Sequence, residues 1–367
     1  MYDAIIVGAR CAGAPTAMNL ARRGHRVLLV DRARFPSDTL STHALNPEAV
    51  ARLKGWGLLG RVLEAGSRPI RQFELHCGDV HVAMPTPPGE AIILCPRRTV
   101  LDNILVAAAR EAGVEVREEF SVRDLMRDDS GRVTGIAGVD EHGDAVYENA
   151  RIVIGADGRN SIVARQVDAE KYQQLPGLTC GYYSYFEGFD DGDAMRVQFD
   201  RNRAIFVFPT NHGQTCLGVE YQRHRWQALR ADVDGHLQQA YEDVGLGQVY
   251  RKATRVERWL GMISPEWYYR RPFGPGWALV GDAGYLKDPV LGMGINDAFR
   301  DSDNLVDALD AVFTGNKEYD EALSAYQQQR DSASFMVNQV NYEFSKLEVT
   351  PDMVRMLQMM IVAEPAA

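Results

Sequence analysis

Short apolar runs and amphipathic stretches alternate through the first part of the chain, in the order expected of strands and helices. The runs DAIIVG (3–8) and RVLLVD (26–31) are largely apolar and predict buried strands. Between them PTAMNLARRG (15–24) has helical spacing, and further amphipathic helical stretches are predicted over 46–66 and 97–116. A strand, tight turn, helix and strand in this order predict a Rossmann-like α/β domain.

The middle of the chain has the shorter period of strands. Residues 71–95 are broken by glycine and proline as in hairpins, and residues 177–224 alternate aromatic and polar positions as in an antiparallel sheet. A strand, loop and helix return over 277–309. The interleaving predicts a discontinuous nucleotide-binding domain (1–70, 97–170 and 271–317), a β-rich substrate domain (71–96 and 171–270) and a C-terminal helical segment (318–367).

Composition narrows the class of protein. The 367 residues are 46% hydrophobic and carry a formal net charge of −10, which argues against a nucleic-acid partner. Five scattered cysteines without a CxxC pair suit reduced thiols in the cytoplasm. No apolar run approaches the roughly 20 residues of a membrane span, so no stable membrane insertion is expected. A small-molecule substrate is the expected partner, and the oligomeric state is left open.

The turn after the first strand, VGARCAG, is a candidate phosphate-binding turn. Gly8 and Gly13 keep the spacing needed for the tight turn and for close helix–strand packing, and the following helix N-terminus favours a pyrophosphate. Asp31 ends the second strand, where a carboxylate would bond an adenosine ribose. Arg10 replaces the middle glycine of the usual Gly-x-Gly-x-x-Gly pattern. We expect its guanidinium to clamp a phosphate; the alternative is contact with the 35–46 loop or the substrate side.

Two more glycine-rich motifs follow in order, IVIGADGRNSIVAR (152–165) and WALVGDAGYLKDPVLGMGINDA (277–298), with RRTVLD (97–102) between the first turn and them. Together they resemble the FAD-dependent oxidoreductase superfamily typified by p-hydroxybenzoate hydroxylase. That superfamily includes class A flavoprotein monooxygenases, geranylgeranyl-reductase-like enzymes and flavin-dependent halogenases. The resemblance covers most of residues 1–312 and implies bound FAD, an FAD-binding domain interleaved with an antiparallel substrate domain, and a helical C-terminal tail.

The resemblance also implies roles for individual residues. Asp282 would bond the ribityl hydroxyls beside Gly281, and the N–H groups of Gly294 and Ile295 would face the flavin N1–C2=O edge, where negative charge develops on reduction. Arg98 would reach the ribityl or phosphate region, with Arg97 as its rival. The full expected cofactor set is Gly8, Arg10, Gly13, Asp31, Arg32, Arg98, Asp157, Gly281, Asp282, Gly292, Gly294 and Ile295.

No second Gly-x-Gly-x-x-Gly turn follows, so NAD(P)H is expected only as a transient co-substrate. The resemblance to the hydroxylases implies a monooxygenase that hydroxylates an aromatic or polyketide-like molecule through a flavin C4a-hydroperoxide. Such chemistry needs a dry pocket. Its expected walls are Tyr183, Tyr185, Phe206 and Phe208, although alternating aromatics also serve simply to pack a sheet.

Other reactions within the superfamily are weighed by what the sequence contains. The tryptophan pair of halogenases does not occur, and the loop FPSDTLSTHALNP (35–47) lacks the cysteine common in geranylgeranyl reductases. Double-bond reduction nevertheless remains the main alternative; a halogenase or a non-catalytic flavoprotein is less favoured.

Three residues are candidates for catalysis. His43 in this loop is expected to titrate near neutral pH and to move a proton, unless it only caps the next helix. Asp288 and Pro289 are expected near the reactive edge of the flavin, although an Asp-Pro turn explains them equally well. The histidines show no metal-ligand spacing, so no metal is expected.

Overall fold

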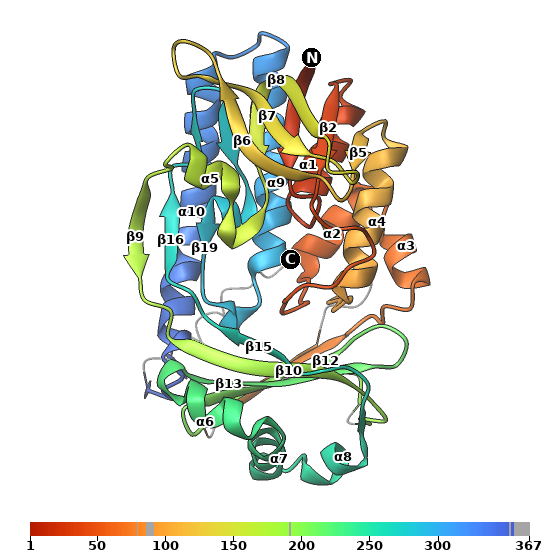
Figure 1. The fold of residues 1–367 in the computed structure, drawn as a ribbon. Coiled ribbons are helices and arrows are strands. Elements are labelled where there is room, and N and C mark those ends of the chain that lie inside the picture. Colours follow the sequence, from red (N-terminus) through yellow and green to blue (C-terminus); the bar gives the residue numbers. More distant parts are fainter. Residues whose placement is uncertain (79, 86–91, 191, 352–353, 356–367) are drawn as a thin grey trace.

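The computed structural model describes residues 1–78, 80–85, 92–190, 192–351 and 354–355 (Figure 1). One sheet lies among helices α1, α4 and α9, and a second, curved sheet lies beyond it with α6, α7 and α8 on its far side (Figure 1). The chain passes between these parts several times. The mixed α/β class and the helical C-terminal region expected from the sequence are confirmed.

The first sheet has a parallel centre. Strand β1 (Tyr2–Val7) pairs in parallel with β2 (Val27–Val30) on one side and with β8 (Ala145–Gly155) on the other. Its strands are apolar because both faces of a parallel sheet are covered. The order is β17-β18-β8-β1-β2-β5, with β6 and β7 continuing from β8; the remaining bounds are β5 (Glu115–Arg117), β6 (Ser121–Arg127), β7 (Val133–Val139), β17 (Phe273–Gly274) and β18 (Trp277–Leu279).

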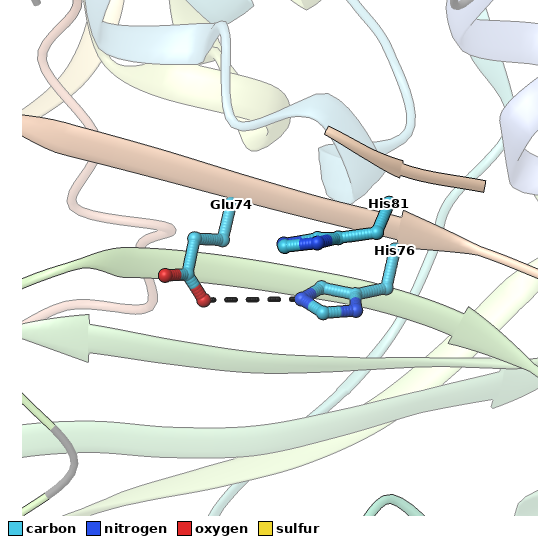
Figure 2. Close-up of side chains that lie close together, drawn as sticks. All are labelled: Glu74, His76 and His81. Carbon is cyan, nitrogen blue, oxygen red and sulfur yellow. Dashed lines mark ion pairs between the residues drawn. The ribbon is translucent and has the colours of Figure 1, made fainter. Parts of the chain in front are cut away.

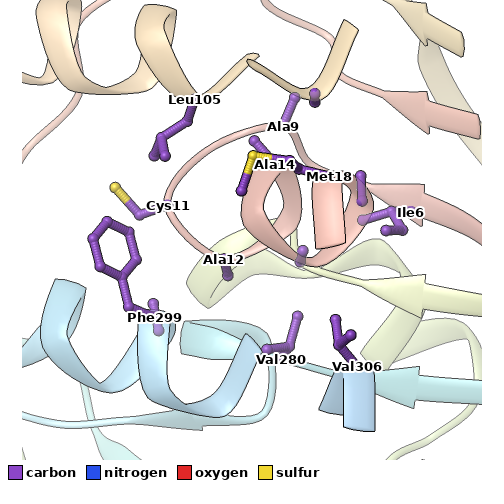
Figure 3. Packing of buried hydrophobic residues seen from close by; sticks show 14 of the residues in the cluster. Ile6, Ala9, Cys11, Ala12, Ala14, Met18, Leu105, Val280, Phe299 and Val306 are labelled. Carbon is purple, nitrogen blue, oxygen red and sulfur yellow. The ribbon is translucent and has the colours of Figure 1, made fainter. Parts of the chain in front are cut away.

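Helices cover one face of this sheet and a smaller antiparallel layer covers the other. Ile6 faces a core shared with α1, α4 and α9, whereas Ile5 faces β6, β7 and α5. Figure 3 shows the first core where α1 meets α9, with Cys11 beside Phe299. The helices are α1 (Gly13–Arg22), α2 (Pro47–Gly55), α3 (Leu59–Glu64), α4 (Arg98–Glu111), α5 (Ile162–Gln166) and α9 (Gly294–Phe313).

The second sheet is antiparallel except at one pair. Strand β3 runs parallel to β11, because the hairpin of β3 and β4 comes from a distant part of the chain. The strands, in spatial order, are β14 (Thr254–Arg255), β10 (Thr179–Glu187), β13 (Thr215–Gln222), β12 (Arg203–Pro209), β11 (Met195–Asp200), β3 (Gln72–Cys77) and β4 (Val80–Pro85), with β15 (Leu260–Ile263) also pairing with β10.

The two faces of the second sheet bury different side chains. Ile205 and Val207 pack toward α6, α7 and α8, whereas Phe208 and Tyr185 pack toward the 40–45 loop. The three helices lie within the part expected to be β-rich, and the strand pattern of 177–224 gave no sign of them. Their bounds are α6 (Trp226–Ala231), α7 (Val233–Asp243) and α8 (Gly247–Lys252).

The C-terminal helix connects both parts. Helix α10 (Tyr319–Ser345) packs along α9, and Phe344 near its end reaches the core of the second sheet. Arg330 is buried and bonds the carbonyl of Arg270 (3.0 Å). Residues 356–367 of the expected helical segment lie outside the described residues. A third sheet contains β9 (Lys171–Leu175), β16 (Trp267–Arg270) and β19 (Tyr285–Leu286), and short helical turns are η1 (Gly158–Asn160), η2 (Arg223–Arg225), η3 (Gly281–Ala283) and η4 (Pro289–Leu291).

Within the described part of the chain, no helix has both the length and the apolar composition needed to cross a bilayer.

Candidate active site

The turn between β1 and α1 has room for glycine alone at two positions. Gly8 has φ +104°, and a Cβ there would lie 2.5 Å from the carbonyl oxygen of Ala156. A Cβ at Gly13 would lie 1.8 Å from the carbonyl oxygen of Gly8. Helix α1 therefore starts in direct contact with the turn, and among the described residues no side chain caps its first N–H groups. The N–H of Ala14 donates to the carbonyl of Arg10 (3.0 Å), that of Thr16 donates to Ala12 (3.3 Å), and Pro15 has no N–H, so the N–H of Gly13 is the group at this helix end that can face an anionic ligand.

Asp31 fixes the shape of this turn. Its carboxylate accepts hydrogen bonds from the N–H of Ala9 (2.7 Å) and from the N–H of Ala33 (2.8 Å). Arg32 beside it is exposed. The ribose contact implied for Asp31 stays a prediction, and the structure adds a bracing role that the sequence did not indicate.

Arg10 is bound by protein groups. Its guanidinium donates to Asp102 Oδ2 (2.6 Å) and to Ser37 Oγ (2.9 Å), and it lies over the ring of Phe35. This is the alternative orientation, toward the 35–46 loop, and not the favoured phosphate clamp. A phosphate contact would require the side chain to leave Asp102.

Asp102 accepts hydrogen bonds from several side chains of this region. It was not among the expected site residues, although it ends the RRTVLD motif. This fully buried carboxylate accepts from Nε and Nη2 of Arg98 (3.0 Å each) and from Cys11 Sγ (3.2 Å), besides Arg10. Burial disfavours the charge of Arg98, but Asp102 outweighs it and raises the pKa of the guanidinium. Arg98 thus stays cationic inside the nucleotide-binding part.

Arg97 and Arg98 point to different places. Arg97 lies over the ring of Tyr185 (3.9 Å) and pairs with Glu257 (3.0 Å), at the substrate sheet. Arg98 is near enough to Asp282 for its charge to lower the pKa of that carboxyl. This placement favours Arg98 over Arg97 as the cofactor residue.

Asp282 lies in the turn η3, shortly after strand β18. Its side chain is exposed to solvent, yet protein surrounds it closely enough that burial raises the pKa of its carboxyl, against the charges of Lys287, Arg98 and Arg159. The neighbouring Gly281 has φ +63°, and a Cβ there would lie 2.8 Å from Ala12 Cβ. The turn η3 therefore abuts the start of α1.

The loop before α9 continues the same surface. Gly292 has φ +68°, and its missing Cβ would lie 3.3 Å from Ala44 Cβ in the 35–46 loop. Gly294 has open space where a Cβ would stand, and Ile295 is buried. Among the residues that the structure covers, no side chain caps the start of α9. Its first N–H groups are therefore free to face a ligand edge, as the resemblance implies.

A buried ionic cluster holds the first turn of α9. Asp297 pairs with Lys287 and accepts from Arg300 Nη1 (2.6 Å), and Arg300 also pairs with Asp301 (2.8 Å). The sequence reasoning did not identify these residues, and one member of the cluster, Lys287, lies outside the helix.

Asp157 is held on the opposite side of η3. Its Oδ2 accepts from the N–H of Ile162 (2.6 Å), while its Oδ1 is buried without a partner in the described chain. Burial raises the pKa of its carboxyl. The unsatisfied oxygen leaves Asp157 able to accept one further donor.

The 35–46 loop carries His43 onto the inner face of the substrate sheet. His43 is fully buried with φ 62°, and its Nε2 lies 2.6 Å from Tyr185 Oη. The N–H of Ser41 donates to Tyr183 Oη (3.1 Å). Phe206 and Phe208 stack at 4.9 Å and join the same cluster. The four expected wall residues thus lie together beside this loop.

His43 does not titrate near neutrality as expected. Burial, and then the charges of Arg98 and Arg97, lower the pKa of His43 to about 3. Its Nδ1 is buried and has no hydrogen-bond partner among the described residues. A neutral imidazole of this kind exchanges hydrogen bonds but does not serve as a base for a solvent proton.

Asp288 and Pro289 lie at the other end of the inner face. Asp288 is buried, accepts from Thr179 Oγ1 (3.0 Å to each oxygen) and caps η4 through the N–H of Val290 (3.2 Å). Pro289 begins η4 and is half-buried. Buried Glu220 on β13 is close to Asp288: burial and the charge of Asp288 raise the pKa of Glu220. This carboxyl pair was not anticipated.

The arrangement fits a dinucleotide with a reactive ring at one end. Three segments follow one another in space: the turn at Gly8, the turn at Asp282 and the start of α9. Together they form one continuous surface, which ends against the loop that carries His43. The uncapped helix ends suit phosphate and a ring edge that becomes negative, and Asp282 suits hydroxyl groups.

Comparison with known proteins agrees with this geometry. The model of the FAD binding domain family matches residues 1–339. A menaquinone reductase of Mycolicibacterium smegmatis is 27% identical over 80% of this chain and 73% of its own. The 3-demethoxyubiquinol 3-hydroxylase of Escherichia coli is 27% identical over 88% of this chain and 82% of its own.

Solved structures show the same fold. The myxobacterial chondrochloren halogenase CndH superposes with a TM-score of 0.85 at 20% identity, over 98% of this chain and 89% of its own. A reductase, a hydroxylase and a halogenase thus occur among the similar proteins, and the halogenase is described as FAD-dependent. The chain therefore belongs to the FAD binding domain family, within the superfamily of FAD-dependent oxidoreductases typified by p-hydroxybenzoate hydroxylase.

Proposed function

We propose that this FAD-dependent oxidoreductase is a monooxygenase that hydroxylates an aromatic or polyketide-like small molecule, with NAD(P)H and O2 as co-substrates. The observation that carries the proposal is the cluster formed by Tyr183, Tyr185 and the 35–46 loop, next to Gly292 before α9. It combines an apolar aromatic wall with two buried hydroxyl groups. Such a wall excludes water while it orients a phenol-like ring.

Bound FAD supplies the electron transfer and the activation of oxygen; the chain positions the substrate and moves protons. The catalytic role that we propose for His43 rests on its hydrogen bond to Tyr185. When Tyr185 donates to Nε2, the proton of neutral His43 resides on Nδ1, the nitrogen that has no described partner. Neutral His43 can then donate a hydrogen bond from Nδ1 to a substrate oxygen, while Tyr185 holds the ring in this tautomer.

Cofactor contacts are part of the proposal. Gly8 and Gly13 admit the pyrophosphate, Asp282 takes the ribityl hydroxyls, and the N–H groups of Gly294 and Ile295 stabilise the reduced ring edge. Asp288 and Pro289 fix the turn that leads into this edge. Five buried free thiols favour a reducing compartment, and we propose the cytoplasm.

The test uses the FAD-loaded protein with a panel of phenols and aromatic polyketides. We expect NADPH or NADH oxidation to accelerate with the correct aromatic, and one oxygen atom from 18O2 to appear in the product. In Tyr185→Phe we expect hydroxylation to fall at least about tenfold, with hydrogen peroxide formed instead. Tyr147→Phe is the matched control, because Tyr147 is 67% exposed. Product formation without 18O would contradict the proposal.

The second candidate is double-bond reduction, which the similarity to a menaquinone reductase supports. It is tested separately. Chemically reduced enzyme is mixed anaerobically with a menaquinone or a geranylgeranyl lipid, and the product is examined by mass spectrometry. A gain of two hydrogens that persists after the quinone ring is reoxidised in air, with no oxygen atom added, would support the reductase and contradict the monooxygenase.

A further inference from the structure

Three potential metal ligands gather on the outermost hairpin of the substrate sheet. Strands β3 and β4 pair so that His76 lies directly opposite His81, and Glu74 lies two residues before His76 on the same face (Figure 2). Side chains two apart on a strand share a face, and directly opposed residues are the closest across a pair. The sequence analysis expected no metal because linear spacing among the histidines was lacking. Pairing of β3 with β4 brings the two histidines together, although their spacing in the sequence does not indicate a metal site.

The ligand atoms have distances suited to one ion. One donor atom from each of the three side chains lies within 4.8 Å of the others, and the two imidazole rings stack at 4.1 Å. His76 Nε2 lies 3.8 Å from Glu74 Oε2, too far for a hydrogen bond. Two ligands bound at about 2.1 Å to one zinc ion lie roughly 3.4–3.8 Å apart. The distance between His76 Nε2 and Glu74 Oε2 is therefore close to the distance between two ligand atoms that bind the same ion.

Among the described residues, no hydrogen bond to His76 Nε2 would compete with a metal ion. This nitrogen is buried and has no hydrogen-bond partner among the residues that the structure describes. An unpaired buried nitrogen facing a carboxylate is costly unless something bridges the two.

The carboxylate is held in place by a second layer of groups. Arg196 donates to Glu74 Oε2 through Nε (2.8 Å) and Nη2 (2.7 Å), and Gln72 donates to Oε1 (2.7 Å). Groups of this kind orient metal ligands. The charge of Arg196 opposes a cation, so we expect weaker binding than in a closed four-ligand site.

We propose that Glu74, His76 and His81 bind a zinc ion that clamps the β3–β4 hairpin at the edge of the substrate sheet. Two imidazoles and one carboxylate are a ligand set that zinc accepts, with water completing the tetrahedron. The ion would join two neighbouring strands at an edge where β4 pairs only with β3 among the strands that the structure describes. Its role in this position is to fix the hairpin.

The experiment titrates FAD-loaded protein with Zn2+ in competition with a fluorescent zinc indicator. We expect one equivalent to bind, and the affinity to fall at least about tenfold in His76→Ala, in His81→Ala and in Glu74→Gln. His142→Ala is the matched control: His142 is exposed and also lies near a carboxylate, that of Glu141 (3.5 Å), but among the described residues it belongs to no group of three potential metal ligands. Bound zinc should also slow hydrogen exchange in residues 72–77 and 80–85.

Two outcomes would overturn the proposal. One is equal zinc affinity in wild type and in the His76→Ala/His81→Ala double variant; the other is no binding of Zn2+ at 100 times the indicator's own dissociation constant. FAD content and the far-ultraviolet circular dichroism spectrum show whether each variant folds. If His76→Ala alters the FAD content or the spectrum, His81→Ala becomes the variant that tests the proposal. His81 is exposed, so we expect its replacement to leave the fold intact.

Discussion

At the scale of single residues, His43 shows how strongly burial changes chemistry. Its ring contacts Tyr183 and Tyr185 and has no exposed surface. The usual pKa of about 6.5 would suit an acid–base residue, but burial and two arginines lower the pKa of His43 to about 3. His43 is therefore neutral in the folded protein and interacts through hydrogen bonds, not through a positive charge.

This lowered pKa predicts a dependence of stability on pH. The unfolded chain protonates His43 below about pH 6.5 while the folded chain does not, so stability is lost as pH falls from about 6.5 toward 3. Between pH 7.5 and 5 we expect wild type to lose about 2 kcal/mol more than His43→Gln in the free energy of unfolding by urea. Equal losses would show that folded His43 takes up the proton.

Arg10 gives a second prediction at this scale. Replacing it by glycine restores the usual dinucleotide pattern but removes the bonds to Asp102 and Ser37. We expect Arg10→Gly to lower the free energy of unfolding of the apoprotein by about 2 kcal/mol, the value of hydrogen bonds to charged groups, with unchanged FAD affinity. Arg34→Gly is the control, since Arg34 is 78% exposed. Weaker FAD binding at unchanged apoprotein stability would instead support the phosphate clamp.

At the scale of elements, the β1–α1 unit was the most predictable part of the molecule. Its strand, turn and helix depend on neighbours in sequence, so the pattern of apolar residues and glycines contains most of the information. The wall residues Tyr183 and Tyr185 were also predictable, because alternation places them on one face. Helices α6, α7 and α8 were missed in a segment interpreted as β-rich.

The backbone packs so closely around Gly13 that one added methyl group should disturb the β1–α1 unit. A Cβ there overlaps the carbonyl of Gly8, so α1 must shift away from the phosphate position. We expect Gly13→Ala to weaken FAD binding by about tenfold or more and to destabilise the protein by about 1–3 kcal/mol. Both quantities are measured by flavin fluorescence and urea unfolding. Gly60→Ala in α3 has open space, so we expect unchanged FAD binding and no loss of stability.

At the scale of the whole molecule, the groups that the sequence could not predict are those joined by distant segments. Glu220 and Asp288 come from different parts of the fold, and so do Arg10 and Asp102. No local pattern indicates such pairs, because sheet pairing and helix docking decide which side chains meet. The candidate site was thus predictable as a set of glycine-rich turns, and its charged contacts were not.

The pair of Glu220 and Asp288 predicts the opposite pH response to that of His43. Burial raises the pKa of both carboxyls, so the folded state keeps protons that the unfolded state releases, and stability falls as pH rises above about 4.3. We expect Glu220→Gln to lose less stability than wild type between pH 5 and 8 in urea unfolding. Glu141→Gln, with a 59% exposed side chain, should behave as wild type. A parallel loss in Glu220→Gln and wild type would show that Glu220 is ionised in the folded protein.

The central sheet also has a consequence for how the chain is synthesised. Strand β1 is synthesised well before its neighbour β8, which starts at Ala145, and before β18, which lies on the far side of β8 and starts at Trp277. The early strands, which are apolar, therefore lack these partner strands until much later in synthesis. Pairings so distant in sequence slow folding and leave edges open to aggregation. We expect nascent chains that end before β18 to need chaperones, and the FAD site to form only late in translation.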